Sequence, residues 1–384
     1  MRTLSRRLTV LPGRAMVAAP DILVLAGTRP ECIKLAPVIA GLERHRSLRV
    51  LTVNSGQHAE AVTRSFAEFS LASDIALPAL PPLPHLGASC AHLQRELRAV
   101  IASVRPRLVL VQGDTLTTYA GARAAHEEGV CVAHLEAGLR TDSDSDPFPE
   151  EWFRRRIAQR ADLHFAPTPL AVDHLLAEGV AGACIHHVGN TGIDTLRALM
   201  GELVASPREE NLVLVTLHRR ENCDGNAAVV CRALRSLVRV QPGLRLVFPV
   251  HPNPRIGQRI RRELGSDPAF ALVLPLGYRD FIGLAARAAL IVSDSGGIQE
   301  EAPHLGTPLL VPRRNTERPE SLATGFTRLV DTEHDALLAA ALATLRAPRA
   351  AAVPFDDDAP FGDGHAATRV IHVLERQLVQ RAYA

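Results

Sequence analysis

The stretch LVLAGTRPECIKLAPV, residues 23–38, passes from a short apolar run through a glycine-containing turn into a helical pattern. Similar apolar runs recur along the chain, most of them ending in a glycine or polar turn, with helical segments between them. Alternation of buried strands with helices is typical of a parallel, doubly wound sheet. The sequence therefore predicts an α/β fold.

The predicted strands form two sets. They are expected at residues 21–27, 49–56, 107–114, 130–138, 161–168 and 185–190, and again at 211–219, 244–251, 271–276, 289–297, 308–312 and 327–330. The chain of 384 residues is also longer than one hydrophobic core usually serves. We therefore expect two Rossmann-like domains facing a central cleft, residues 21–200 and 201–364, with a hinge near 191–210. An amphipathic helix is predicted at 365–384.

The composition is that of an ordinary globular chain, with 47% apolar residues, 22% charged residues and a net charge of +2. Basic residues form no block beyond Arg154–Arg156, which argues against nucleic acid as a partner. No run of 18 apolar residues occurs, so no membrane-spanning helix is expected. The six cysteines form no C-x-x-C pair and the 16 histidines have no metal-ligand spacing. This favours reduced thiols in a cytoplasm and no structural metal.

Residues 1–20 are basic and then mildly apolar. Pro12, Gly13 and Arg14 interrupt the apolar core that a signal peptide needs. We expect a disordered extension, or translation from Met16, rather than a secretion signal.

The opening stretch contains Lys34, which is the one lysine of the chain; the other 42 of the 43 basic residues are arginine. A cation one turn into a helix opposes the helix dipole, at a cost of about 0.5 kcal/mol. Arginine would serve equally well on a solvated surface, whereas a compact ammonium group differs from a planar guanidinium fork. We therefore expect Lys34 to belong to a site, paired with Arg29 in a positively charged pocket. Chance survival of a surface lysine is the alternative.

Polar motifs follow the predicted strands where each strand ends. GTRPE, GDTLTT and HLEAGLR do so in the first domain, and HRREN, HPNP and DSGGIQEE in the second. Because ligands bind at the carboxyl ends of strands in open α/β sheets, these motifs predict a site between the domains.

The first domain supplies carboxylates. Asp114 and Glu136 end successive strands, and Glu150 follows a proline that would start a helix. Acids at strand ends in a cleft are candidates for acid–base chemistry, and acids facing the Arg29/Lys34 pair suit an anionic substrate. Each acid alone is as readily an N-cap or a solvated side chain.

The second domain supplies an element for binding anions. Ser295, Gly296 and Gly297 lie between a strand and a helix, where two glycines let backbone N–H groups approach an anion. Two acids follow, and such an acid can accept hydrogen bonds from ribose hydroxyls. The pattern is not G-x-G-x-x-G, so NAD is not implied; a simple tight turn is the alternative. His218, beside two arginines, is interpreted as a diphosphate ligand rather than a structural histidine.

Together these motifs resemble the non-hydrolysing UDP-N-acetylglucosamine 2-epimerase family, whose order they keep over roughly residues 21–380. They are GTRPECIKLAPV, SGQH, GDTLTT, HLEAGLRT, PFPEEWFRR, GNTGID, TLHRREN, PVHPNP, SDSGGIQEEAPHLG, NTERPE and PFGDG. The resemblance implies the glycosyltransferase-B fold, in which the last helix crosses back to the first domain. It also implies a homodimer that supplies ManNAc units to surface polysaccharide and needs no redox cofactor or metal.

Members of this family interconvert UDP-N-acetylglucosamine and UDP-N-acetylmannosamine. UDP is eliminated to give 2-acetamidoglucal and is then re-added with C2 inverted. The resemblance implies that the three acids move the C2 proton and support the glycosidic oxygen. It also implies that Lys34, Arg29 and His218 handle the sugar and diphosphate. The further substrate contacts that it implies, for diphosphate, ribose and additional anchoring, are Ser295, Gly296, Glu301, Arg318 and Arg154.

Three positions depart from the family pattern. Phe153 stands where an asparagine is usual, and a phenyl ring cannot replace an amide that binds substrate or positions Glu150. Leu116 replaces a threonine in GDTLTT, and Arg314 replaces an acid before NTERPE. A modified UDP-sugar substrate therefore stays open.

Family members are often activated by UDP-N-acetylglucosamine at a second site, to which Gln57 and His251 match. LPALPPLPHLGAS replaces the basic stretch usual after the SGQH helix, which argues against this activation. Two other classes of function stay open. One is a related enzyme that hydrolyses the substrate to free sugar plus UDP or transfers the sugar. The other is a UDP-sugar binder without catalysis.

Overall fold

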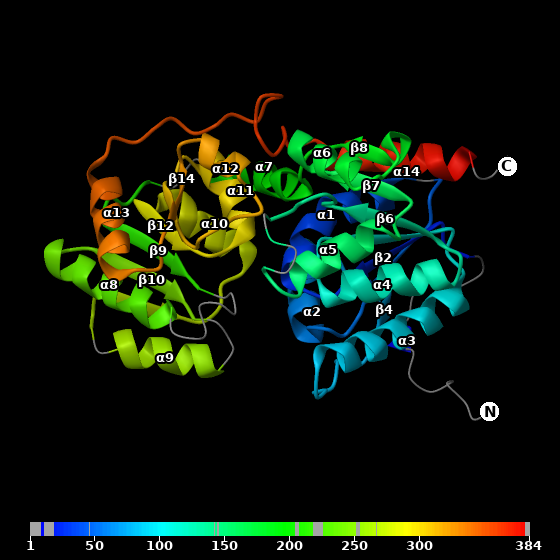
Figure 1. Cartoon of the computed structure of the whole chain (residues 1–384), viewed down its shortest axis with the longest axis horizontal. Helices are drawn as coiled ribbons and strands as arrows, with labels where there is room; N and C mark the ends of the chain where they lie inside the picture. Colours follow the sequence, from blue (N-terminus) through cyan, green and yellow to red (C-terminus); the bar gives the residue numbers. More distant parts are fainter. Residues whose placement is uncertain are drawn as a thin grey trace. The chain divides into compact units, whose positions relative to one another are not determined.

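The computed structural model describes residues 9–10, 19–45, 47–141, 143, 146–203, 207–217, 226–250, 254–265 and 267–380. The chain divides into two compact units. Unit 1 comprises residues up to Thr195 together with those from Phe361 onward, and unit 2 comprises Leu196–Pro360. Each unit is a sheet covered by helices (Figure 1). The predicted fold class, an α/β protein with two Rossmann-like domains, is confirmed.

The sheet of unit 1 has the strand order β1-β4-β3-β2-β5-β6-β7-β8, with β1 antiparallel to β4 and the other neighbours parallel. From β4 to β7 this is the 3-2-1-4-5-6 order of a Rossmann fold, so the order reverses between β2 and β5. The strands are β1 (Thr9–Val10), β2 (Ile22–Ala26), β3 (Val50–Asn54), β4 (Ile75–Ala76), β5 (Leu108–Gln112), β6 (Cys131–Leu135), β7 (Leu163–Ala166) and β8 (Ile185–His187). The two strands that sequence analysis missed, β1 and β4, have two residues each and are too short to show a pattern.

Helices cover both faces of this sheet. They are α1 (Arg29–Arg44), α2 (Ala59–Glu68), α3 (Leu86–Val104), α4 (Leu116–Glu127), α5 (Glu150–Ala158), α6 (Pro169–Ala177), the 3-10 turn η1 (Gly182–Cys184) and α14 (Ala366–Gln380). Helix α7 (Thr191–Leu203) contains the boundary between the units.

Alternate residues of β2 enter two different cores, as expected for a strand buried on both faces. Val24 packs in a cluster with residues of α1, α2 and α14, whereas Leu25 packs in a cluster with residues of α3, α4 and α5. Val370 and Leu374 bring α14 onto the same side as α1. The chain therefore returns to unit 1 after completing unit 2.

The sheet of unit 2 has the order β11-β10-β9-β12-β13-β14, which is again 3-2-1-4-5-6 and reverses between β9 and β12. Its strands are β9 (Leu212–Thr216), β10 (Arg245–Pro249), β11 (Phe270–Val273), β12 (Leu290–Ser293), β13 (Leu309–Pro312) and β14 (Thr327–Val330). Its helices are α8 (Ala227–Val240), α9 (Pro254–Leu264), α10 (Tyr278–Arg287), α11 (Gly296–Leu305), α12 (Glu320–Ala323) and α13 (His334–Arg346). Every strand predicted from the sequence is present in the two sheets.

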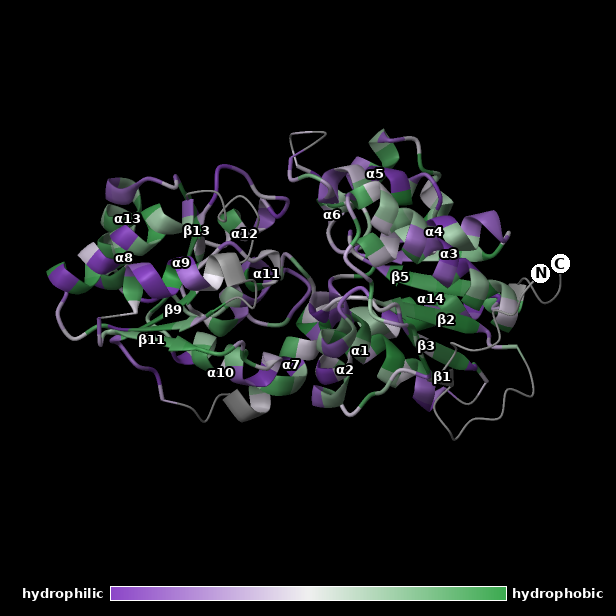
Figure 2. Cartoon of the chain, turned by 90° about the horizontal axis from the view of Figure 1, so that it is seen from below, coloured by the Kyte–Doolittle hydropathy of each residue, from purple (hydrophilic) through white to green (hydrophobic). Residues whose placement is uncertain are grey.

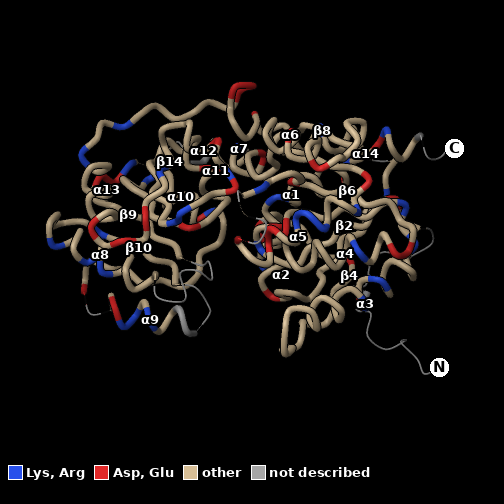
Figure 3. Tube along the Cα trace, in the orientation of Figure 1, with Lys and Arg blue, Asp and Glu red and all other residues tan. Residues whose placement is uncertain are grey.

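Hydrophobic residues concentrate in the strands, and hydrophilic residues occupy stretches of the covering helices (Figure 2). Charges of both signs are interspersed over both units (Figure 3), as the small net charge predicts.

Among the described helices, none is long and apolar enough to cross a membrane. The described cysteines, Cys32, Cys90, Cys131, Cys184 and Cys231, are free thiols. Most of the predicted N-terminal extension, including Met16, lies outside the described residues.

Candidate active site

The turn after β2 carries the first side chains of the site. Gly27 leads from the strand into α1, and an ideal Cβ at this position would lie 1.8 Å from the Thr117 hydroxyl oxygen, so glycine is required. Helix α1 then places Arg29, half-buried, at its first position and Lys34 further along. The buried Lys34 ammonium forms an ion pair with the Glu136 carboxylate. The fold thus joins two predicted site residues that lie far apart in the sequence.

Glu136 directly follows β6 and has a left-handed backbone, with φ +64°. Few non-glycine residues adopt this conformation, and it persists where the surrounding structure imposes it. The side-chain amide of Gln112, at the end of β5, donates to Glu136 Oε2, and the amide of Asn190 lies 3.5 Å from Oε1. The carboxylate is therefore held by one cation and two amides from separate elements.

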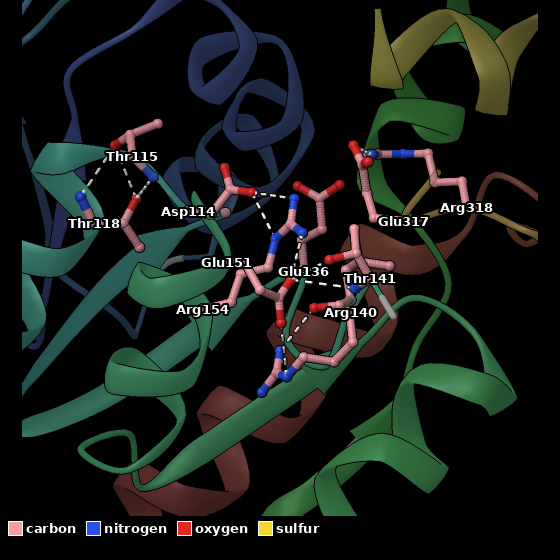
Figure 4. Close-up of polar contacts among 12 residues, drawn as sticks. Asp114, Thr115, Thr118, Glu136, Arg140, Thr141, Glu151, Arg154, Glu317 and Arg318 are labelled. Atoms are coloured by element: carbon pink, nitrogen blue, oxygen red, sulfur yellow. Dashed lines mark hydrogen bonds and ion pairs between the residues drawn. The ribbon is translucent and has the colours of Figure 1, made fainter. Parts of the chain in front are cut away.

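Asp114, two residues after β5, is held by Arg154 of α5 (Figure 4). Arg154 donates from Nε to Asp114 Oδ2 at 2.8 Å and from Nη1 to Glu151 Oε2 at 2.9 Å. Glu151 is fully buried, accepts from the Thr141 N–H at 3.2 Å and pairs with Arg140. A buried ion-pair network therefore orients the cation that faces Asp114.

Both clusters lie at the carboxyl ends of β5 and β6. The turns after β2 and β5 flank the place where the strand order of unit 1 reverses. In open α/β sheets this switch point is where ligands bind. The arrangement places two fixed carboxylates, each with a cationic partner, at that position.

Phe153 belongs to the hydrophobic core. Its ring is 2% exposed, stacks on Tyr119 with 5.0 Å between the ring centroids, and meets Trp152 edge-on at 5.6 Å. Leu116 is buried in the same cluster, whereas Arg314 is exposed. The first two departures from the family pattern thus pack the layer formed by α4 and α5. Phe153 is therefore a core residue, and the effect of lacking an amide here, on substrate or on Glu150, stays a prediction.

Glu150 is the first residue of α5 and is half-buried. Gln57 accepts hydrogen bonds through its amide oxygen from the Thr117 N–H at 2.9 Å and the Thr117 hydroxyl at 2.7 Å. Gln57 therefore holds the start of α4, and its part in activation stays a prediction. His218 and His251 lie outside the described residues.

In unit 2, the loop after β12 leads into α11, with Ser295 as the N-cap residue and Gly296 as the first helical residue. An ideal Cβ at Gly296 would lie 2.5 Å from the Arg318 guanidinium, so glycine lets this group approach the helix start. Arg318 is buried and pairs with Glu300 and, at 2.5 Å, with Glu317. A helix N-terminus beside an oriented guanidinium suits an anion such as a diphosphate.

Glu301 lies on the same helix and is buried. Its Oε1 accepts a hydrogen bond from the Tyr278 hydroxyl at 2.7 Å. The fold thus gathers Ser295, Gly296, Glu301 and Arg318, the described ones among the predicted residues of the second domain, on or against α11. Like unit 1, unit 2 places its polar residues after a strand that borders its switch point.

Two buried groups near these clusters titrate away from their usual ranges. Burial raises the pKa of Glu31, on the first turn of α1, to about 7, although hydrogen bonds from Thr115 and Gly27 lower it. Burial lowers the pKa of His134 on β6 to about 3, and its Nε2 lies 2.7 Å from the Gly113 carbonyl. Glu31 therefore holds a proton close to neutrality, whereas His134 is uncharged. Within the described part of the chain, no group of three or more His, Cys, Asp or Glu side chains could hold a metal ion.

Sequence analysis missed several polar partners of the site: Glu31, Gln112, Glu151, Asn190, Glu300 and Glu317. Glu151 and Glu300 each adjoin an acid that was selected, and each pairs with a buried arginine. The sequence PEE alone does not show that its second acid forms an ion pair with a buried arginine. Glu31 stands inside GTRPE, a strand-end motif from which only Arg29 was selected.

Two Rossmann units, one with paired carboxylates and one with a helix start that suits an anion, are typical of enzymes that act on nucleotide-linked substrates. The family model described as UDP-N-acetylglucosamine 2-epimerase matches residues 40–375. The chain belongs to this family.

Named relatives cover nearly the whole chain. It is 38% identical over 368 residues to the probable UDP-N-acetylglucosamine 2-epimerase of Ralstonia solanacearum, spanning 92% of this chain and 98% of that protein. It is 34% identical to the UDP-N-acetylglucosamine 2-epimerase of Escherichia coli K12, spanning 93% and 99%.

Solved structures show the same architecture. The Neisseria meningitidis UDP-GlcNAc 2-epimerase bound to UDP-GlcNAc matches with a TM-score of 0.85 at 32% identity, over 92% of this chain and 99% of that one. The S. aureus MnaA–UDP structure matches with a TM-score of 0.84 at 34% identity, over 94% and 97%.

Proposed function

We propose that this protein catalyses the reversible C2 epimerisation of UDP-N-acetylglucosamine to UDP-N-acetylmannosamine. The observation that carries the proposal is the Glu136 carboxylate, clamped by Lys34 and Gln112 at the switch point of unit 1. Membership of the epimerase family supports the reaction, and the Neisseria neighbour bound to UDP-GlcNAc supports the substrate.

The proposed reaction proceeds through 2-acetamidoglucal. A carboxylate removes the C2 proton, the C1–O bond breaks, and UDP leaves with its electron pair as the C1–C2 double bond forms. UDP then adds back to C1 while a proton is delivered to the opposite face of C2. We assign these proton transfers to Asp114, Glu136 and Glu150, because acids held at strand ends suit acid–base chemistry.

The cations stabilise charge that develops on the leaving diphosphate. Lys34 and Arg29 serve this role from unit 1, with Arg154 as an anchor behind Asp114. In unit 2, we assign the diphosphate to Ser295 and Gly296, and the ribose to Glu301. Arg318 is a further anchor, and His218 completes the cation set in this proposal.

The chemistry needs no redox cofactor or metal, because UDP itself is the leaving group and the returning nucleophile. We also propose, from family resemblance, that the enzyme acts as a cytoplasmic homodimer supplying ManNAc units to surface polysaccharide.

Proton NMR of the purified protein with UDP-N-acetylglucosamine in D2O tests this function. Deuterium at C2 together with a UDP-N-acetylmannosamine signal is the expected result. Free sugar plus UDP would mean hydrolysis instead. UDP binding without any change in the sugar would contradict the proposal and point to a modified sugar nucleotide or a binding role.

A further inference from the structure

Glu31 is buried among hydrogen-bonding groups of Gly27, Thr115 and Thr118, in the turns that carry the candidate site. We call these four residues the polar box. The Glu31 side chain is 1% exposed. Oε2 accepts from the Gly27 N–H at 2.9 Å, while Oε1 lies 2.8 Å from the Thr115 hydroxyl and 3.2 Å from the Thr118 hydroxyl. One carboxyl group therefore connects the turn after β2 with the first turn of α4.

The protons in this box can be counted. Thr118 has one hydroxyl proton, and its oxygen lies 2.6 Å from the Gln112 carbonyl, which can only accept. That proton therefore goes to Gln112. The contact between Thr118 and Glu31 then lacks a proton unless Glu31 supplies one. The geometry favours a protonated carboxyl group that donates to Thr118 and accepts from Thr115.

The hydrogen bonds of the polar box also position residues that carry the proposed chemistry, Asp114 and Glu136. Thr115 and Thr118 form the capping box of α4, and Thr115 directly follows Asp114. Thr118 holds the backbone carbonyl of Gln112, whose side chain donates to Glu136. Displacing Thr118 would therefore displace Gln112 and loosen the Glu136 carboxylate.

We propose that Glu31, in its protonated form, is a positioning residue that holds segment 112–118 so that Gln112 fixes Glu136 and Asp114 faces Arg154. The inference rests on the proposed epimerase function. Glu31 acts through other side chains and is not itself assigned to contact substrate.

The other titratable groups around the polar box form ion pairs or have pKa values that burial shifts away from neutrality. Lys34 pairs with Glu136, and Asp114 pairs with Arg154. Burial raises the pKa of the Cys32 thiol, and burial lowers the pKa of both His58 and His134. Since burial raises the pKa of Glu31 to about 7, Glu31 is the group here that we expect to change charge near neutral pH.

The test compares Glu31→Gln and Glu31→Ala, with Glu43→Gln as a matched control on the exposed part of α1. A glutamine can donate to Thr118 and accept from Gly27, so it copies these two contacts of the protonated acid, and the Thr115 hydroxyl can turn to accept from the same amide nitrogen. We expect Glu31→Gln to keep kcat within about 3-fold of wild type at pH 6. Glu31→Ala should lose roughly 100-fold in kcat at similar KM, since small displacements at a site can cost this much.

The pH profile separates positioning from simple packing. The ratio of wild-type kcat to that of Glu31→Gln should fall as pH rises through about 7, because only wild type loses the proton. The ratio to Glu43→Gln should stay constant. A pH-independent ratio for Glu31→Gln, or a loss equal to that of alanine, overturns the proposal. If Glu31→Ala does not fold, the Glu31→Gln ratio alone decides.

An activity-free measurement distinguishes failure of this inference from failure of the proposed function. Infrared difference spectra of wild type minus Glu31→Gln should show a protonated carboxylic acid band at pH 6 that disappears by pH 8. Absence of the band at pH 6 refutes the protonated state whether or not the enzyme epimerises. If the band appears but wild type exchanges no C2 proton, the epimerase function fails, and with it the positioning role.

Discussion

The two units share the strand order 3-2-1-4-5-6 but differ in their polar clusters. Unit 1 has a cluster centred on an acid, because Lys34 and Gln112 converge on Glu136, beside the cluster in which Arg154 faces Asp114. In unit 2 the central group is a cation, because Glu300 and Glu317 converge on Arg318.

This difference suggests that unit 1 carries the acid–base chemistry and that unit 2 anchors the nucleotide. A carboxylate held by donors can give up and take back a proton, whereas a guanidinium stays charged at every working pH. We therefore expect changes in unit 1 to alter kcat and changes in unit 2 to alter nucleotide affinity. The predictions below test that division.

Glu136→Gln should have the largest effect. The amide keeps the shape but cannot take a proton, so turnover should fall by about 100- to 10,000-fold. Deuterium incorporation at C2 measures the loss, and calorimetry should show unchanged UDP affinity. Glu60→Gln, at an exposed position of α2, is the matched control. Persistent exchange at C2 would remove Glu136 from the proton-transfer role.

Phe153→Asn should lower stability by about 3 kcal/mol, because it removes a buried ring and buries an amide. Urea unfolding measures the change, and Phe153→Leu should cost less because it stays apolar. Increased epimerase activity of the asparagine variant would show instead that position 153 reaches the substrate.

Glu31, the buried acid on the first turn of α1 in unit 1, should make stability depend on pH. Its folded pKa, about 7, lies above the ordinary value of 4.5, so its contribution to stability is fully present below pH 4.5. That contribution is lost as pH rises towards 7, by about 3 kcal/mol in total. Denaturant unfolding at pH 5 and pH 8 should show this loss for wild type but not for Glu31→Gln. Equal pH dependence of the two proteins would contradict it.

Lys34→Arg should reduce kcat by roughly 100-fold, because a planar fork cannot replace a compact ammonium beside Glu136 without displacing it. The fold should be intact by circular dichroism. Arg64→Lys on the exposed face of α2 exchanges the same two residue types in reverse and should have no effect. A near-normal rate would mean that the lysine at position 34 was kept by chance and has no role in catalysis.

Arg318→Lys should have the smallest effect, raising the Kd for UDP by about 10-fold while kcat changes little, since the bidentate anchor is lost but the charge stays. Isothermal titration calorimetry with UDP provides the measurement. Arg314→Lys, at a neighbouring exposed arginine, should bind UDP normally. A large fall in kcat for Arg318→Lys would contradict the assignment of catalysis to unit 1 and of nucleotide binding to unit 2.

The sequence by itself determined the architecture and the edge of each sheet at which chemistry occurs. Strands buried on both faces are continuously apolar, so runs such as Ile22–Ala26 and Leu212–Thr216 stand out without any structure. Parallel strands end at one edge, so Asp114, Glu136 and Ser295 could be selected as strand-end residues.

The tertiary structure alone decided how those residues are paired and charged. Lys34 and Glu136 are separated by 102 positions, and local spacing contains no record of such a contact. Glu151 pairs with Arg154, and Phe153 is buried beside Tyr119. The raised pKa of Glu31 follows from burial, and burial is a property of the packed fold rather than of the motif GTRPE.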